Sequence, residues 1–331
     1  MIRYDLAAAD RRGIEQVISN LAGLGLPADE PALLEAAVVA AHELPRPLRE
    51  QLVALRLREL TSTLLVSGFA VDDNELGPTP GHWRDVPSGP LTRPEAYLLL
   101  VGSLLGDAFG WSTQQDGRII HNVLPIKGHE RQQVSSNSAV TLSWHTEDGF
   151  CAYRPDYVVL LCLRNPDHAV TRYADVSRLP IPAADRELLS EPLYRIRSDY
   201  SHRPAQNLAD PAKQATFELV HSYTELLPIL SGDLSDPVVR LDADFLDPPA
   251  NPRHAAALRR LCELVESSLE DLVLAAGELL IIDNFRAVHG RAPFAARFDG
   301  TDRWLKRMYI TRDLRRSRPM RRGITGRLLF A

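Results

Sequence analysis

Between residues 117 and 311, short apolar runs alternate with loops that contain proline and glycine. This spacing is typical of a β sandwich or jelly roll, since a parallel sheet needs a crossover helix between successive strands. Only one long helix, predicted over 252–275, interrupts the runs. We therefore expect an α+β fold with a mainly β core, a double-stranded β-helix (jelly roll) with surrounding helices. Strands are predicted over 118–125, 140–147, 157–163, 193–197, 216–223, 237–241, 278–284 and 304–311.

The first 110 residues have a different pattern. The first sixty are expected to be helical, with apolar side chains at helical spacing over 14–21 and 33–41 and a third helix over 48–60. A strand is predicted over 63–71 and a helix over 94–105. No repeat or linker divides the chain, so we predict a single domain over 1–331. It would contain a helical part (1–110) packed on a jelly-roll core (111–320), with an insert near 197–275.

Composition excludes several classes of protein. Hydrophobic residues make up 45% and charged residues 24% of the chain, which favours a sizeable core over disorder. The sequence contains no run of about 18 apolar residues, so no membrane span is predicted. Arg3 and Asp5 interrupt the start, so we expect no export signal. Three cysteines without a Cys-x-x-Cys motif indicate neither a disulfide framework nor a thiolate zinc site, and a cytoplasmic location is expected.

Charge is unevenly distributed along the chain. The net charge is −5, yet residues 303–327 contain ten Lys or Arg and one acid, Asp313. Such a basic stretch could contact nucleic acid, but few aromatic residues follow Tyr309 to stack on bases. We expect a solvated segment, no nucleic-acid or membrane partner, and a small-molecule substrate. The oligomeric state stays open.

A candidate metal site begins with His145 and Glu147, two positions apart in the predicted strand 140–147. Alternate side chains of a strand leave the same face, so imidazole and carboxylate can reach one ion. This pair alone is weak evidence, because about one His-x-acid match is expected by chance. A second histidine, His289, follows an apolar predicted strand and its turn. Two histidines and one carboxylate can hold Fe(II) and leave three positions open for a bidentate cosubstrate and oxygen.

Five segments together resemble a known family: HTED (145–148), LRNPD (163–167), IDN (282–284), VHGR (288–291) and FDGTDRWLKR (298–307). The chain resembles the Fe(II)/2-oxoglutarate oxygenases of the clavaminate synthase-like (TauD-type) group. Within this group it is most similar to hydroxylases of free amino acids, such as the viomycin-pathway arginine hydroxylase, asparagine oxygenase and lysine hydroxylases. The resemblance extends from about residue 114 to residue 318 and more faintly into the N-terminal helices.

The resemblance implies roles for the cofactor-binding residues. His145, Glu147 and His289 would hold the iron, with glutamate where many related oxygenases have aspartate. Arg303 would bind the distal carboxylate of 2-oxoglutarate, with help from Thr171. A guanidinium fork suits this task because it forms two parallel hydrogen bonds and stays charged in a dry pocket. Oxygen would be the second cosubstrate, and no catalytic residue beyond the metal ligands is expected.

Substrate-binding residues are predicted partly from spacing. If 303–309 is a strand, Arg307 shares a face with Arg303. The resemblance implies that Arg307 holds the substrate's α-carboxylate, although a solvent-facing arginine is the alternative. Asp242 and Asp244 are again two positions apart and can form a fork for a guanidinium or ammonium group. The resemblance implies that this pair binds the side-chain cation, while an ordinary Asp-rich loop is the alternative.

Three further assignments follow from the resemblance or from composition. Gln114 (or Gln115) and Ser135 fall near positions that contact the substrate's α-amino and carboxylate groups in relatives. The polar segment 197–214, broken by Pro204 and Pro211, has the composition of a mobile loop. We predict that this segment is a lid that closes over the substrate and excludes water.

These observations favour a 2-oxoglutarate-dependent oxygenase that hydroxylates the β or γ carbon of a free L-amino acid. Arginine is expected first, followed by citrulline and lysine, in a natural-product pathway such as antibiotic biosynthesis. The same chemistry on asparagine, on a carrier-bound or cyclic amino acid, or a desaturation remains an alternative. A non-catalytic jelly-roll protein that binds a metal or ligand is the alternative from another class.

Overall fold

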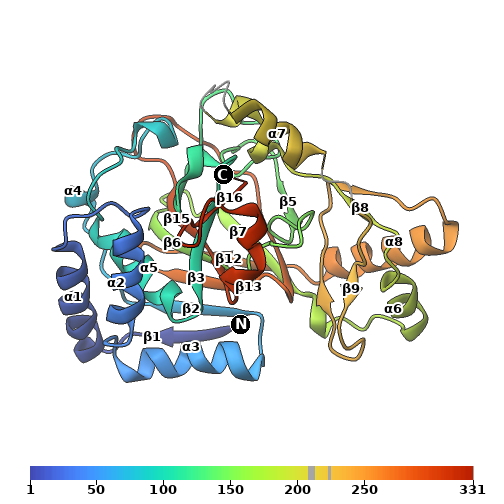
Figure 1. The fold of residues 1–331 in the computed structure, drawn as a ribbon, viewed down its shortest axis with the longest axis horizontal. Coiled ribbons are helices and arrows are strands. Elements are labelled where there is room, and N and C mark those ends of the chain that lie inside the picture. Colours follow the sequence, from blue (N-terminus) through green and yellow to red (C-terminus); the bar gives the residue numbers. More distant parts are fainter. Residues whose placement is uncertain (208–212, 223–224, 331) are drawn as a thin grey trace.

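The apolar run around residue 160 forms the middle strand of the larger sheet, β6 (Tyr157–Arg164), in the computed structural model, which describes residues 1–207, 213–222 and 225–330 (Figure 1). Val158 and Leu160 face one side of this sheet, and Val159 and Leu161 face the other. Both sides are covered, so the strand is apolar throughout instead of alternating with polar residues.

The larger sheet has eight strands in the described part of the chain, and most of its pairings are antiparallel. The exceptions are β1 with β2 and β16 with β3, which run parallel. In spatial order its strands are β1 (Ile2–Asp5), β2 (Thr63–Ser67), β13 (Leu279–Asp283), β6, β15 (Trp304–Thr311), β3 (Asp107–Trp111) and β16 (Leu328–Leu329), with β4 (Ile120–Val123) also paired to β15.

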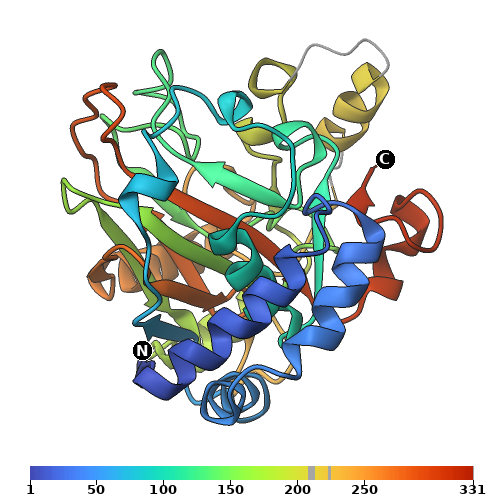
Figure 2. The same ribbon diagram turned by 90° about the vertical axis from the view of Figure 1, so that its left-hand side faces the viewer.

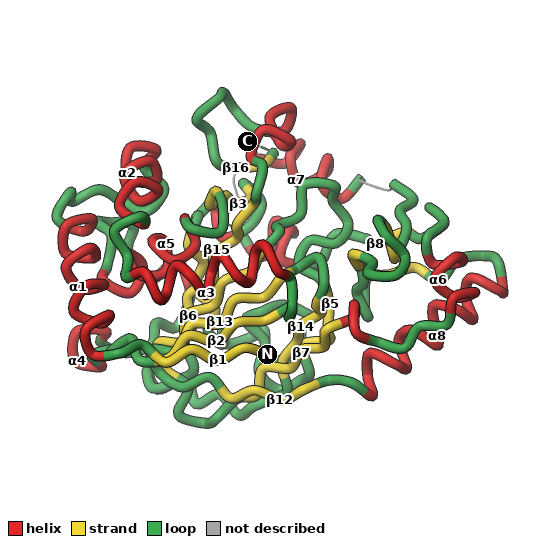
Figure 3. The backbone as a smooth tube through the Cα atoms, turned by 90° about the horizontal axis from the view of Figure 1, so that it is seen from below, coloured by secondary structure: helices red, strands yellow, loops and turns green. Residues whose placement is uncertain are grey.

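The smaller sheet lies beside the larger one (Figure 3). An apolar cluster joins the two sheets, and it includes Leu280 and Leu305 of the larger sheet and Tyr173 and Leu272 of the smaller one. The site described below lies where the two sheets face each other. In spatial order the strands of the smaller sheet are β12 (Glu270–Val273), β7 (Val170–Asp175), β14 (Ala287–Arg291) and β5 (Leu142–His145).

Helices cover the outer sides of both sheets. The N-terminal helices lie over the larger sheet (Figure 2), where Leu48 and Leu52 share a buried cluster with Leu279 and Ile281. On the opposite side, α6 and α8 pack on the smaller sheet, and Leu258 and Leu261 share a cluster with Val288 and Trp144 (Figure 1). The helices are α1 (Ala8–Ala22), α2 (Pro31–Ala41), α3 (Arg46–Arg58), α4 (Asp73–Leu76), α5 (Arg93–Ser103), α6 (Ala183–Leu189), α7 (Gln214–His221) and α8 (Pro252–Ser267).

Two short antiparallel pairs complete the segment between β7 and β12. They are β8 (Arg195–Ile196) with β11 (Leu246–Asp247) and β9 (Leu230–Ser231) with β10 (Val238–Val239). The predicted lid over 197–214 begins directly after β8, and its residues 208–212 lie outside the described residues. The described helices include none long and apolar enough to cross a membrane.

Several predicted elements are wrong. The strand predicted over 216–223 is helix α7, because Phe217 and Val220 are buried at helical spacing; Tyr223 lies outside the described residues. The helix predicted over 252–275 ends at Ser267, and Glu270–Val273 forms β12 instead. The first sixty residues are not all helical, since Ile2–Asp5 pairs with β2. Strands β3, β7 and β14 were not predicted.

A tight turn between β12 and β13 gives a test of the packing. Gly277 has φ +82°, and a Cβ there would lie 1.8 Å from the carbonyl oxygen of Phe69. Gly128 has φ +95° but no atom within 4 Å of its Cβ position. Gly128→Ala should therefore lose only about 1–2 kcal/mol of unfolding free energy from the left-handed backbone. Gly277→Ala should lose about 1–3 kcal/mol more, because the chain must also move. Urea unfolding measures both, and equal losses would contradict this packing.

Candidate metal centre and cavity

Two histidines face each other across neighbouring strands of the smaller sheet. His145 of β5 lies directly opposite His289 of β14 in the antiparallel register, and their ring centroids are 4.7 Å apart. Glu147 follows β5, and its Oε2 lies 3.6 Å from Nε2 of His145 and 3.3 Å from Nε2 of His289. One ligand atom from each residue lies within 4.8 Å of the others. Among the described residues, the predicted triad therefore comes together.

The backbone of Glu147 is held by a buried asparagine. Asn284 follows β13 and is fully buried. Its Oδ1 accepts a hydrogen bond from the amide of Glu147 (2.7 Å), and its Nδ2 donates to the carbonyl oxygens of Glu147 and Pro155 (2.9 Å each). Asn284 belongs to the IDN segment and had no predicted role. Its signal was the second of two polar residues, Asp283 and Asn284, that follow the buried apolar run 279–282.

The two oxygens of the Glu147 carboxylate differ in their hydrogen bonding. Oε1 accepts hydrogen bonds from Nη1 of Arg307 (2.9 Å) and from the Tyr309 hydroxyl. Oε2 is buried without a hydrogen-bond partner among the described residues. His145 Nδ1 lies 2.8 Å from the carbonyl oxygen of Ser143, to which it can donate, so Nε2, on the side of Oε2, can offer its lone pair to a metal ion. The free ligand atoms thus face one point.

The charges around this point favour a cation. Burial would raise the pKa of Glu147, but Arg307 and the two imidazoles lower it well below its usual value. Burial would lower the pKa of His145, but Glu147 raises it to about 9. The carboxylate thus draws positive charge to His145 even when only a proton supplies it, whereas burial and the neighbouring His145 lower the pKa of His289. An N₂O donor set of this kind fits Fe(II), and the buried Oε2 atom is free to serve as a ligand.

A cavity extends from the triad between the two sheets. Of the predicted residues, Thr171, Ser135, Arg303, Arg307 and the two predicted aspartates line it, and Gln114 does not. The lining residues are Val123, Gln133, Val134, Ser135, Leu142, Ser143, His145, Glu147, Leu160, Thr171, Asp199, Ser201, Asp242, Asp244, Phe245, His289, Gly290, Arg291, Arg303, Leu305 and Arg307.

In one part of the cavity, buried arginine side chains lie without a carboxylate partner among the described residues. Arg303 is 5% exposed, its Nε has no hydrogen-bond partner, and burial lowers its pKa to about 10. Thr171 Oγ1 is also buried without a partner among the described residues. Arg291 lies opposite Thr171 in the sheet, and burial together with Arg303 lowers its pKa to about 9. Burial of a charge without a partner raises the free energy of the folded protein, so binding of an anion in this region would be favourable.

Arg291 was quoted in the sequence analysis without a role. Two of its nitrogens donate to Asn137, through Nη1 to the carbonyl oxygen (2.7 Å) and through Nη2 to the side-chain oxygen. Its Nε has no partner. Arg291 stands two positions after His289 on β14, so strand alternation could have predicted that both side chains face the cavity.

Carboxylates from two loops line another part of the cavity. Asp242 forms an isolated antiparallel bridge with His145, and its Oδ1 accepts hydrogen bonds from the amides of Asp244 and Phe245 (2.9 Å each). Burial raises the pKa of Asp242 to about 6. Asp244 is exposed at the rim. A third carboxylate, Asp199, was missed, because it lies in an irregular segment where no periodicity indicates which side chains face inward.

Arg307 lies on β15 and lines the same cavity as Arg303, as expected, although Arg303 precedes the strand and the register shifts between Trp304 and Leu305. Its Nη2 donates to Nδ1 of His121 (3.2 Å), which is neutral because burial and Arg307 lower its pKa to about 3. Its Nε has no hydrogen-bond partner among the described residues. The guanidinium is thus fixed by Glu147 and His121, and its Nε–H is still available to a ligand.

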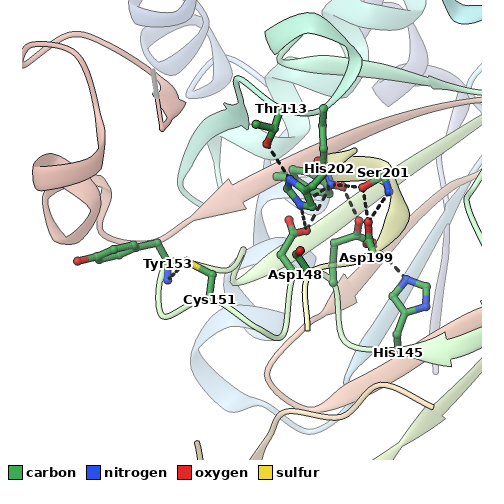
Figure 4. A network of polar contacts seen from close by, with 12 residues as sticks. Thr113, His145, Asp148, Cys151, Tyr153, Asp199, Ser201 and His202 are labelled. Carbon is green, nitrogen blue, oxygen red and sulfur yellow. Dashed lines mark hydrogen bonds and ion pairs between the residues drawn. The ribbon is translucent and has the colours of Figure 1, made fainter. Parts of the chain in front are cut away.

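Gln114 lies behind the wall of the cavity. Its Nε2 donates to Oγ of Ser201 (2.8 Å) and to Oδ1 of Asp148 (3.3 Å), in a network that also contains His202 (Figure 4). Gln115 is turned away and binds the backbone of Asn122. Of the two glutamines considered, only Gln114 therefore touches a residue of the cavity wall.

Comparisons with known proteins agree with this geometry. Residues 84–309 match the model of the taurine catabolism dioxygenase TauD, TfdA family. The chain is 44% identical to an L-ornithine/L-arginine 3-hydroxylase of Catenulispora acidiphila, with 100% of both chains covered. It is 40% identical to an enduracididine beta-hydroxylase of Streptomyces hygroscopicus, with 88% of both covered.

A solved structure has the same fold. The crystal structure of the non-heme iron oxygenase OrfP in complex with Fe, succinate and (3S)-hydroxy-L-Arg superimposes with a TM-score of 0.93 at 40% identity. It covers 99% of this chain and 100% of its own. The likeness thus spans both sheets, the helices and the cavity between them. From its sequence and its fold alike, this chain belongs to the taurine catabolism dioxygenase TauD, TfdA family.

Proposed function

We propose that this protein is an Fe(II)- and 2-oxoglutarate-dependent oxygenase that hydroxylates a free L-amino acid with a cationic side chain. The observation that supports this most is the division of one cavity into three parts. A His–His–Glu triad lies beside an unpaired buried arginine and beside three carboxylates. A structural metal site would have no use for the unpaired arginine, which argues against a non-catalytic protein. We also propose that the two facing sheets form a jelly roll.

His145, Glu147 and His289 would hold the ferrous ion. Bound together with 2-oxoglutarate and oxygen, the ion would supply an oxidant able to remove hydrogen from an unactivated carbon. Arg307 and Tyr309 occupy Oε1 of Glu147, so only Oε2 remains for the metal. The protein's task is to fix which C–H bond lies nearest the iron.

Arg303 and Thr171 would bind the distal carboxylate of 2-oxoglutarate. Both have buried donors without partners, which a carboxylate would satisfy. Arg291 adds a second guanidinium to the same region and would raise its preference for an anion. The two arginines also explain why a dicarboxylic acid, with one carboxylate at the metal, suits the cavity.

The amino acid would bind between Arg307 and the carboxylates. The free Nε of Arg307 can donate to the α-carboxylate, and Asp199, Asp242 and Asp244 can hold a guanidinium or ammonium group. Ser135 and Gln114 would contact or support the α-amino and carboxylate groups. Arginine and ornithine fit three carboxylates better than neutral asparagine or citrulline does. Similarity to a 3-hydroxylase supports attack at the β carbon.

A direct test uses purified protein with Fe(II), 2-oxoglutarate and air. The twenty amino acids, ornithine and citrulline are supplied singly, and mass spectrometry measures a gain of one oxygen while succinate is quantified. We expect hydroxylated arginine or ornithine with stoichiometric succinate. Succinate release that no free amino acid stimulates would contradict the proposed substrate class. If no succinate is released at all, the proposed 2-oxoglutarate-dependent activity is contradicted.

Removal of a metal ligand should weaken metal binding without unfolding the protein. His145→Ala should lower the affinity for Fe(II), or for Co(II) as a probe, by about 100-fold or more, since even outer-shell changes cost 10–100-fold. Equilibrium dialysis measures the affinity, and turnover should be lost in parallel. His42→Ala, at the exposed end of α2, is the control. Unchanged metal affinity in His145→Ala would rule out this residue as a ligand.

Loss of Arg303 should act on the cosubstrate. Arg303→Leu should raise the 2-oxoglutarate concentration for half-maximal turnover by about 100-fold or more, because loss of one partner of a buried ion pair costs about 3–5 kcal/mol. The increase in Tm caused by 2-oxoglutarate should also disappear. Arg297→Leu, which removes a surface ion pair with Asp167, should change neither value. A normal requirement for 2-oxoglutarate in Arg303→Leu would contradict the assignment.

Loss of the aspartates should act on the amino acid instead. Asp242→Asn should raise KM for arginine or ornithine by about tenfold or more, whereas the exposed Asp244→Asn should have a smaller effect because water screens its charge. KM for 2-oxoglutarate should stay constant in both. Asp247→Asn, in β11 directly after this loop and paired with Arg197, is the control. Equal increases for both substrates would place the pair outside the substrate-binding part of the cavity.

A further inference from the structure

We propose that His202 is a positioning residue that sets the orientation of the cavity-facing Asp199 relative to the metal ligands. This inference rests on the proposed function, since Asp199 matters only if a cation binds beside it. His202 does not line the cavity and would act through Ser201 and Asp148. The network that these residues form lies beside His145 (Figure 4).

The side chain of His202 is buried although its neighbours are not. It is 0% exposed in the short turn Tyr200–His202, between the half-buried Ser201 and the exposed Arg203. Its ring packs edge-on against Trp111 (centroids 4.9 Å apart) and Phe150 (5.2 Å). A buried ring in an otherwise polar, irregular segment acts as an anchor, because it can only leave by losing this packing.

Both ring nitrogens of His202 have partners. Nδ1 lies 2.7 Å from Oγ1 of Thr113, and Nε2 lies 3.0 Å from Oδ1 of Asp148. A neutral ring satisfies both if Nε2–H donates to Asp148 and the Thr113 hydroxyl donates to Nδ1. The two N–H bonds of the Gln114 amide then donate to Asp148 Oδ1 and Ser201 Oγ. These four hydrogen bonds are compatible with one another, and Gln114 Nε2 also lies 3.1 Å from Nε2 of His202 without a hydrogen bond between them in this scheme.

A chain of hydrogen bonds leads from this set to the cavity. The amide and hydroxyl of Ser201 both donate to Oδ1 of Asp199, at 2.7 and 2.5 Å. The Gln114 side chain donates a hydrogen bond to Oγ of Ser201. Oδ1 of Asp148 accepts hydrogen bonds from both Gln114 and His202. Asp148 directly follows Glu147. One carboxylate oxygen therefore connects the turn that carries Asp199 with the loop that carries the metal ligand.

This connection matters because the substrate must bridge the two loops. A cation held by Asp199 lies at a fixed distance from the metal only if both loops keep their relative position. Misplacement by about 1 Å can cost about 100-fold in rate. Arg303 directly precedes β15 and Thr171 lies on β7, and among the described residues no hydrogen bond joins either one to this network, so loss of His202 should leave the 2-oxoglutarate end unchanged.

The first test is His202→Phe, which keeps an aromatic ring between Trp111 and Phe150 but removes both hydrogen bonds. KM for the cationic amino acid should rise by about tenfold or more, with KM for 2-oxoglutarate within about twofold of wild type. More succinate should form per hydroxylated product, because the C–H bond is less well placed. A change in neither substrate's KM, or equal increases in both, would overturn the proposal.

Two smaller variants separate the two hydrogen bonds. The amide of Gln can reach the position of Nε2 and keep the contact with Asp148, whereas Asn reaches only the position of Nδ1, near Thr113. His202→Gln should therefore retain most of the wild-type KM for the amino acid, and His202→Asn should resemble His202→Phe. The reverse order would overturn the role given to Asp148. If His202→Phe does not fold, the KM values of these two variants still test the positioning role of His202.

A matched control and a substrate-free measurement complete the design. His254→Phe changes another buried histidine, which packs near Tyr194 and Glu191 on the far side of the smaller sheet, and it should leave both KM values unchanged. Hydrogen exchange at the amides of Ser201 and Arg203 should be faster in His202→Phe, with exchange in β6 unchanged. Unchanged exchange at these amides would overturn the proposal. This readout is independent of turnover, so it still tests His202 if no amino acid is hydroxylated and the proposed function fails.

Discussion

The antiparallel pairing of β5 with β14 is the constraint on which the site depends. It places His145 directly opposite His289, and the chain that leaves β5 carries Glu147 to a point between them. Asn284 fixes the backbone at that point, while Arg307 and Tyr309 fix the side chain. A slip of one residue in this register would turn the imidazoles to opposite faces of the sheet. Trp144 of β5 and Val288 of β14, which are buried in one cluster with Leu258 and Leu261 of α8, oppose such a slip.

Charge separation inside the cavity follows from the same framework. Strands β14 and β7 contribute Arg291 and Thr171, and Arg303 directly precedes β15; each has a buried donor without a partner among the described residues. The loops after β8 and β10 contribute carboxylates. Under the proposed function, a dicarboxylic acid would satisfy the donors and the basic side chain of an amino acid would satisfy the carboxylates. Strands and their ends would then hold the cosubstrate, and loops would hold the side chain of the substrate.

Strand-based predictions succeeded where periodicity specifies a face. The i, i+2 spacing of His145 and Glu147 and the i, i+4 spacing of Arg303 and Arg307 predicted side chains that do share a cavity. Predictions failed where tertiary contacts decide. Residues 214–221 contain strand-forming residues but form a helix, because Phe217 and Val220 are buried on one helical face. Asp199 was not predicted, since it lies in an irregular segment where no strand or helix periodicity indicates which side chains face the cavity.

The central claim is that the triad and Arg303 hold the two ends of one bound cosubstrate. A crystal structure of the protein with Fe(II) and 2-oxoglutarate, grown without oxygen, tests this most directly. The account predicts an ion bound by Nε2 of both histidines and by Oε2 of Glu147, with the distal carboxylate on Arg303. An ion bound elsewhere, or a distal carboxylate far from Arg303, would contradict it.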